Sequence, residues 1–67
     1  MIVVNGEPRD LVAGTTVAEV LEALGVAPGR RGVAIAVDGE VVPRGAWGAT
    51  ALPDGSRVEV VHAIQGG

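Results

Sequence analysis

Residues 16–25 have the sequence TVAEVLEALG, which carries a helical pattern with a start signal and a stop signal. Thr16 and Glu19 fit the capping box S/T-x-x-E. In this motif the Thr side chain accepts a hydrogen bond from an amide of the first helical turn, and the Glu side chain reaches back to the amide of the Thr residue. Gly25 stands where a left-handed residue often ends a helix. The apolar side chains between them form one stripe at helical spacing: Val17, Val20, Leu21 and Leu24. The stretch therefore predicts a helix over about residues 17–24 with a single buried face, which must lie on a sheet.

An N-terminal hairpin is predicted before this helix. Residues 1–4 are apolar and mostly β-branched, which favours a strand. Asn5-Gly6 is a two-residue hairpin signal, so residues 7–12 become the returning strand. Pro8 places that strand at an edge of the sheet, because proline cannot donate a ladder hydrogen bond.

A second hairpin is predicted after the helix. Residues 33–37, VAIAV, form a continuous apolar strand that we expect to be central and covered on at least one face. Asp38-Gly39 is the turn signal. Residues 40–42 then return, and Pro43 ends that strand.

The C-terminal third of the chain is expected to hold an irregular segment and a last strand. Residues 44–55 show no regular period, with Trp47 and Leu52 as apolar anchors. The stretch RVEVVHAI, residues 57–64, alternates weakly and places Val58 and Val60 on one face.

This element order predicts the fold class. Two strands, one helix, two strands and a final strand give an α+β protein, in which one main α-helix packs on a mixed sheet of four to five strands. That arrangement is the ubiquitin-like β-grasp. With 67 residues, the chain is too short for two domains. We therefore expect one domain over residues 1–67, with an extended tail over about residues 62–67.

The composition excludes several classes of function. The sequence has no cysteine and no lysine, so it offers no disulfide, no thiolate ligand and no lysine amine for a Schiff base. The net charge is −3 and the largest basic cluster is Arg30-Arg31, which argues against nucleic acid and against an anionic membrane as partners. No membrane span or signal peptide is visible, so we expect a cytoplasmic protein.

No catalytic constellation can be assembled from the residues either. The chain has one histidine, no phosphate-binding loop of the Walker type and no metal-ligand spacing. His62 has no partner for proton transfer and is expected to be a half-exposed sheet residue. We therefore expect no catalytic residues, no metal and no cofactor bound by this chain, and no enzymatic activity of its own.

The chain ends in HAIQGG, and this tail is the strongest functional signal. Glycine adds no side chain to a core and loses the most backbone freedom on ordering. If residues 62–67 are extended, they project roughly 20 Å at about 3.3 Å per residue. Ile64, Gln65 and Gly66 are the residues expected to thread into a partner enzyme. Because glycine has no Cβ, the end of this thread could enter a channel too narrow for any other residue. The α-carboxylate of Gly67 would be the reactive group at its tip.

Arg44 and Trp47 each have two interpretations. A single tryptophan in a core of valine and alanine is expected to anchor that core, and the alternative is a docking residue. The guanidinium of Arg44 can stack on the indole of Trp47 or hold an acidic group of a partner.

These motifs together resemble the ThiS family, the small sulfur carriers of thiamine (thiazole) biosynthesis. The capped helix, VPRGAW at residues 42–47, the turn Asp54-Gly55-Ser56, the strand after it and the terminal Gly66-Gly67 carry the resemblance, which covers essentially the whole chain. Ser56 departs from the family, in which aspartate is commoner, and this affects only the chemistry of the turn.

The resemblance implies a mechanism for the tail. In the family, a ThiF-type adenylyltransferase uses Mg-ATP to activate the terminal glycine, here Gly67. Sulfur from a persulfide donor then displaces AMP, and the resulting thiocarboxylate passes its sulfur to a ThiG-type thiazole synthase. The carrier is thus a protein co-substrate, and ATP and magnesium belong to the activating enzyme.

Two other functions remain open at this point. The small subunit of molybdopterin synthase shares the terminal diglycine but serves a different client enzyme. A β-grasp binding module whose Gly-Gly end has no function belongs to another class. Ubiquitin-like tagging is compatible with the tail, although the absence of lysine leaves no internal site for chain building.

Overall fold

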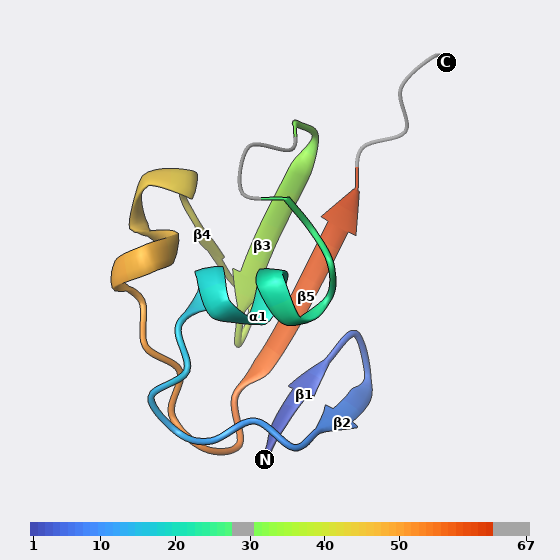
Figure 1. The fold of residues 1–67 in the computed structure, drawn as a ribbon, viewed down its shortest axis with the longest axis vertical. Coiled ribbons are helices and arrows are strands. Elements are labelled where there is room, and N and C mark those ends of the chain that lie inside the picture. Colours follow the sequence, from blue (N-terminus) through green and yellow to red (C-terminus); the bar gives the residue numbers. More distant parts are fainter. Residues whose placement is uncertain (28–30, 63–67) are drawn as a thin grey trace.

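The computed structural model describes residues 1–27 and 31–62, which form a mixed five-stranded sheet with one α-helix across it (Figure 1). The strand order is β2-β1-β5-β3-β4. This arrangement confirms the predicted β-grasp. The elements are β1 (Ile2–Val4), β2 (Glu7–Arg9), α1 (Val17–Ala23), β3 (Val33–Val37), β4 (Glu40–Val42), the 3₁₀ helix η1 (Arg44–Ala49) and β5 (Arg57–His62).

Both ends of α1 are formed by the predicted signals. The amide of Glu19 donates to the Thr16 hydroxyl over 3.2 Å, and the amide of Thr16 donates to the Glu19 carboxylate over 2.9 Å. At the other end the amide of Val26 donates to the carbonyl of Leu21 over 2.9 Å, around Gly25 with φ of +77°. This is the Schellman arrangement, in which a left-handed residue closes the last turn. The helix ends at Ala23, one residue earlier than predicted.

The two predicted hairpin turns are present, and their central residues have a left-handed conformation. Asn5 and Gly6 have φ of +50° and +81°, and Asp38 and Gly39 have φ of +49° and +87°. Such turns match the twist of the flanking strands, which explains the preference for Asn-Gly and Asp-Gly. Both hairpins form antiparallel pairs, β1 with β2 and β3 with β4.

The prediction of a second strand over residues 7–12 was too long. β2 ends at Arg9, which lies opposite Ile2 at the start of β1. The pairing with β1 ends at this pair. The amide of Leu11 bonds the carbonyl of Arg9 over 2.8 Å, and the chain turns away from the sheet. The edge position predicted from Pro8 is confirmed.

The central strand is β5. It pairs in parallel with β1 at Arg57 and Val58, and in antiparallel with β3 from Val58 to His62 (Figure 1). The VAIAV strand, β3, is internal as expected but lies second from the edge. Val58 and Val60 are both buried, so the predicted face of β5 is confirmed.

The prediction that residues 44–55 are irregular was wrong for their first half. Arg44–Ala49 forms η1, which starts with a hydrogen bond from the amide of Ala46 to the carbonyl of Pro43. A 3₁₀ turn this short has no apolar period to detect. Trp47 holds it in place: the indole is 6% exposed and its N–H donates to the carbonyl of Val42 over 2.9 Å. Leu52, the other predicted anchor, is buried too.

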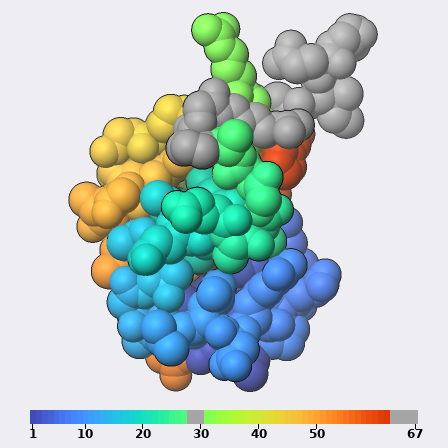
Figure 2. Space-filling view, viewed as in Figure 1, coloured from blue at the N-terminus to red at the C-terminus, as the bar shows by residue number. Residues whose placement is uncertain are grey.

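The core lies between α1, η1 and one face of the sheet. Figure 2 views the molecule from this side, where the helix and the neighbouring segments cover the strands. The core consists of aliphatic side chains and one indole: Ile2, Val4, Val17, Val20, Leu21, Ile35, Trp47, Leu52, Val58 and Val60. Since the sheet contributes alternate residues to this core, its other side chains point to the opposite face.

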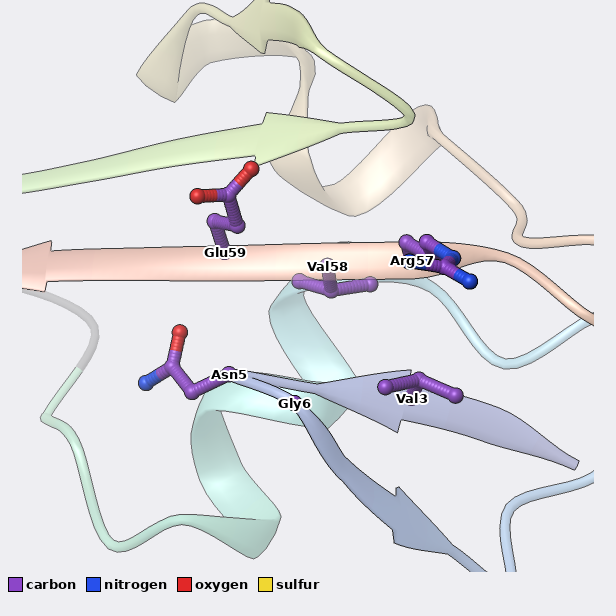
Figure 3. A pocket seen from close by; sticks show the side chains of 6 residues that line it. All are labelled: Val3, Asn5, Gly6, Arg57, Val58 and Glu59. Atoms are coloured by element: carbon purple, nitrogen blue, oxygen red, sulfur yellow. The ribbon is translucent and has the colours of Figure 1, made fainter.

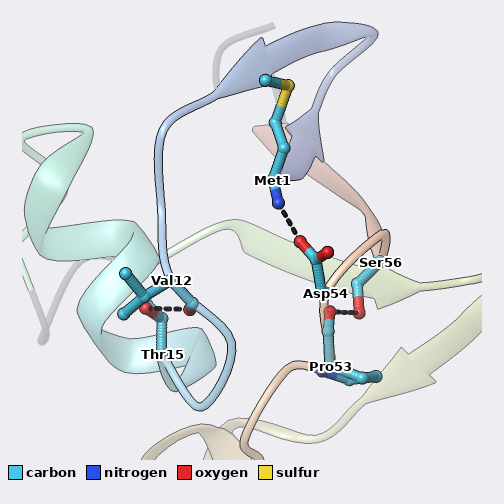
Figure 4. A network of polar contacts seen from close by, with 6 residues as sticks. All are labelled: Met1, Val12, Thr15, Pro53, Asp54 and Ser56. Carbon is cyan, nitrogen blue, oxygen red and sulfur yellow. Dashed lines mark hydrogen bonds and ion pairs between the residues drawn. The ribbon is translucent and has the colours of Figure 1, made fainter.

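A polar network joins the start of β1 to the turn before β5 (Figure 4). The Met1 ammonium forms an ion pair with Asp54, and the Gly55 amide donates to the Met1 carbonyl over 2.8 Å. The buried Ser56 hydroxyl donates to the carbonyl of Pro53 over 2.6 Å. Serine thus closes this turn with its own side chain.

Candidate functional site

Apart from His62, the predicted sulfur-carrying tail lies outside the described residues. Ile64, Gln65, Gly66 and Gly67 lie outside the described residues, so their predicted roles stay predictions. The structure places the residue from which the tail departs: His62, the exposed last residue of β5. This end of the central strand lies at the opposite end of the molecule from the N-terminus (Figure 1).

The end of β5 is held differently on its two sides. On one side the last two residues pair with β3, Val61 with Ala34 and His62 with Val33. On the other side β1 reaches only as far as Val58. Beyond that point the Asn5 side chain accepts a hydrogen bond from the Val60 amide over 2.8 Å. The strand that leads to the tail is therefore fixed by a strand on one side and by a side chain on the other.

The sheet face opposite α1 is a candidate docking surface, here called the open face. No described element covers it, and the two most exposed apolar side chains of the sheet lie on it: Val41 is 75% exposed and Val61 is 58% exposed. The pairing register adds smaller and charged neighbours on the same face, namely Val3, Ala34, Ala36, Arg57 and Glu59. Val61 directly precedes His62, so this apolar surface is continuous with the start of the tail.

A shallow hollow of about 390 Å³ lies on the open face between the first hairpin turn and β5 (Figure 3). Its lining residues are Val3, Asn5, Gly6, Arg57, Val58 and Glu59. In this view α1 lies behind the sheet, and Arg57 and Glu59 flank the hollow from the central strand. The hollow forms where β1 stops and β5 continues.

The structure brings Arg44 and Trp47 together as the stacking interpretation predicts. The Arg44 guanidinium lies 4.6 Å from the centroid of the Trp47 ring, within the range of a cation–π contact. Trp47 is buried in the core, as the core interpretation predicts, and its alternative role as a docking residue stays a prediction. Arg44 is exposed beside it, and its predicted role in partner docking stays a prediction.

Residues 1–27 and 31–62 contain no group of three histidine, cysteine, aspartate or glutamate side chains placed to bind a metal ion. None of the helices formed by these residues has the length and apolar character needed to cross a membrane.

Sequence reasoning missed the second role of the two turn residues. The sequence predicted Asn5 and Asp38 only as turn residues. In the structure, each side chain also accepts a hydrogen bond from an amide of β5. Asp38 accepts from Arg57 over 2.9 Å, as Asn5 does from Val60. An asparagine or aspartate at the first turn position indicates that a side-chain acceptor is present. It does not reveal that the donor is an amide of β5.

Comparisons with known proteins give relatives of this chain in sequence and in fold. Two curated relatives, both thiazole synthases, are similar to almost the whole chain. The relative from Magnetococcus marinus is 46% identical over 94% of this chain, and the one from Paramagnetospirillum magneticum is 39% identical over 98%. The chain spans only about a fifth of the length of these relatives, 19% and 20% respectively.

Solved structures match the fold over its full length. The crystal structure of the thiamine biosynthesis protein ThiS from Geobacter metallireducens is 37% identical, with a TM-score of 0.76, and the match covers 98% of this chain and 97% of that one. A solution structure of a thiamine biosynthesis protein from the same organism, 38% identical, has the same TM-score. Residues 2–67 match the ThiS family itself. From its fold, its terminal motif and this match over nearly every residue, the chain belongs to the ThiS family.

Proposed function

We propose that this chain is a sulfur carrier for the formation of the thiamine thiazole, with the sulfur carried on the Gly67 carboxyl carbon. The observation that carries the proposal is the match to the ThiS family over residues 2–67, which includes the terminal diglycine. The similarity to two thiazole synthases favours this function over that of a molybdopterin synthase subunit.

The chemistry follows from the properties of a carboxylate. A carboxylate is a poor electrophile, so a ThiF-type enzyme first transfers AMP from Mg-ATP to the Gly67 oxygen, and pyrophosphate leaves. The terminal sulfur of a persulfide then attacks the acyl carbon, and AMP leaves. Cleavage of the S–S bond by a thiol releases the thiocarboxylate. The chain itself supplies only the carboxylate and the means to deliver it, so it acts as a co-substrate rather than an enzyme.

Delivery requires a surface that partners can bind while the tail enters their active sites. The open face provides exposed apolar area at Val41 and Val61, and Val61 directly precedes His62, where the tail starts. Exposed apolar area continuous with a functional end is typical of a docking surface. We place the contacts with the activating enzyme and with a ThiG-type thiazole synthase on this face, with Arg44 as a further contact. We place the reaction in the cytoplasm.

The test is the mass of the intact chain after incubation with a ThiF-type enzyme, Mg-ATP and a sulfide source. The wild-type chain should gain the mass that corresponds to replacing one oxygen by sulfur, and fragmentation should place the change on Gly67. Deleting Gly67 should abolish the change, because the new carboxylate stops roughly 3.3 Å short and a misplacement of about 1 Å can cost about 100-fold.

Two controls complete this experiment. A chain amidated at Gly67 keeps the length but lacks the carboxylate, and it should not react. Circular dichroism should show that both variants fold like the wild type, because neither change touches the described core. Thiocarboxylation of the deletion variant at the wild-type rate would refute the proposed function, and a binding module would show no change in mass at all.

A further inference from the structure

The end of β1 leaves a gap beside the strand that leads to the tail. β1 stops at Val4 because Asn5 adopts a left-handed conformation, with φ of +50°, and starts the turn. β5 continues for four residues beyond Val58, its last residue paired with β1. On this side, the described part of the chain provides no strand for Glu59–His62.

The Asn5 side chain fills the first position of the missing ladder. The Asn5 amide donates to the Val58 carbonyl over 2.8 Å, which is the last backbone bond between the two segments. The next amide of β5 that points to this side is that of Val60, and it donates to the Asn5 carboxamide oxygen over 2.8 Å. A side-chain oxygen thus takes the place that a backbone carbonyl would have if β1 were longer.

The same arrangement occurs at the other end of β5, on the side of β3. Asp38 also starts a left-handed turn, with φ of +49°, and its carboxylate accepts from the Arg57 amide over 2.9 Å. Asp38 therefore fixes the start of β5, and Asn5 fixes the part that precedes the tail. The two residues form a natural pair for comparison because turn type, left-handed conformation and acceptor role are shared.

We propose that Asn5 is a positioning residue for the C-terminal tail, a role that rests on the proposed sulfur-carrier function. By holding the Val60 amide, Asn5 keeps the last residues of β5 attached on the side that β1 does not reach. The tail is then anchored at His62. If the strand frayed back by two residues, the anchor would move by roughly 7 Å. Delivery of a carboxylate to a reacting atom depends steeply on such displacements.

The test compares three variants of the full chain with the wild type. Asn5→Gly removes the acceptor and keeps the turn, because glycine is favoured in the left-handed position. Asn5→Asp keeps both the turn and an acceptor oxygen, so it should rescue the loss. Asp38→Gly is the matched control, since it removes the corresponding bond from the start of β5 and leaves the Val60 contact intact.

Amide hydrogen exchange measured by NMR gives the first readout. In Asn5→Gly, the exchange rate at Val60 should rise roughly fivefold to tenfold, as expected for the loss of one hydrogen bond. Asn5→Asp should stay near the wild-type rate. In Asp38→Gly the increase should appear at Arg57 and not at Val60. This readout does not depend on any enzyme.

The kinetics of thiocarboxylate formation give the second readout, with a ThiF-type enzyme, Mg-ATP and sulfide. For Asn5→Gly we expect kcat to fall about threefold to tenfold while KM changes by less than about twofold, because docking is intact and delivery is impaired. Asp38→Gly should behave like the wild type. If Asn5→Gly shows the faster Val60 exchange but wild-type kcat, or if Asp38→Gly loses as much activity, the positioning role is overturned while the carrier function stands. If the wild-type chain itself is not thiocarboxylated, the proposed function and this role fall together.

Discussion

Replacing Trp47 by alanine tests whether this residue is structural or belongs to a docking site. The indole is 6% exposed, lies in the core cluster and donates to the Val42 carbonyl. Truncation of a buried tryptophan costs about 3 to 5 kcal/mol. A domain of this length has a total stability of roughly 3 to 10 kcal/mol, taken at about 0.05 to 0.15 kcal/mol per residue. Trp47→Ala should therefore remove a large part of the stability, or all of it.

Two further variants separate the contributions at this position. Trp47→Phe keeps an aromatic ring in the core but leaves the Val42 carbonyl without its donor, which should cost about 1 to 3 kcal/mol. Arg44→Ala removes the cation–π contact at 4.6 Å, which is worth about 0.5 to 1 kcal/mol at an exposed site. The expected order of stability is wild type, Arg44→Ala, Trp47→Phe and Trp47→Ala.

The assay is urea unfolding followed by far-ultraviolet circular dichroism. Fluorescence is unsuitable because Trp47 is the only aromatic residue of the chain. With a slope of about 1 kcal/mol per molar urea for a small domain, the midpoint should fall by about 3 M or more in Trp47→Ala. An unchanged midpoint together with weaker binding to the activating enzyme would refute the core interpretation and make Trp47 a docking residue.

Three other predictions address the helix, a turn and the docking surface. Thr16→Ala should lower the free energy of unfolding by about 1 kcal/mol, because the Glu19 amide loses its capping acceptor; an unchanged urea midpoint would contradict this. Ser56→Ala should cost about 1 kcal/mol through the lost hydrogen bond to Pro53, measured by thermal unfolding. Val41→Asp should weaken binding to a ThiF-type enzyme by about tenfold or more in calorimetric titration, because it places a charge on the apolar open face. Val12→Asp is its matched control, since Val12 is also 75% exposed but lies outside the sheet, and equal losses in both would exclude the open face.

Much of the fold could be predicted because its signals are local. The capping box at Thr16 and Glu19, the left-handed residue Gly25 and the two turn pairs all act through their own backbone conformations or through neighbours three residues away. Local geometry does not depend on the rest of the fold, so these predictions were confirmed. The buried face of β5 was likewise visible from the alternation around Val58 and Val60.

The errors arose where the partner of a segment decides its structure. The length of β2 depends on how far β1 extends opposite it, and the 3₁₀ helix η1 depends on the contact of Trp47 with Val42. The sequence around these segments contains no period that reports such contacts. The candidate docking face had the same limitation: Val41 and Val61 lie on one face of the sheet only through the register of β4 and β5 with β3.

The sequence by itself determined the element order, the turns, the capped helix and the terminal diglycine, because each depends on residues close together in the chain. The tertiary structure alone decided that β5 is central, that its open face is continuous with the start of the tail, and that Asn5 and Asp38 hold its two ends. Those hydrogen bonds join residues 55 and 19 positions apart, Asn5 to Val60 and Asp38 to Arg57. A side-chain acceptor can satisfy any amide within reach, so its partner is fixed only when the sheet brings the two segments together.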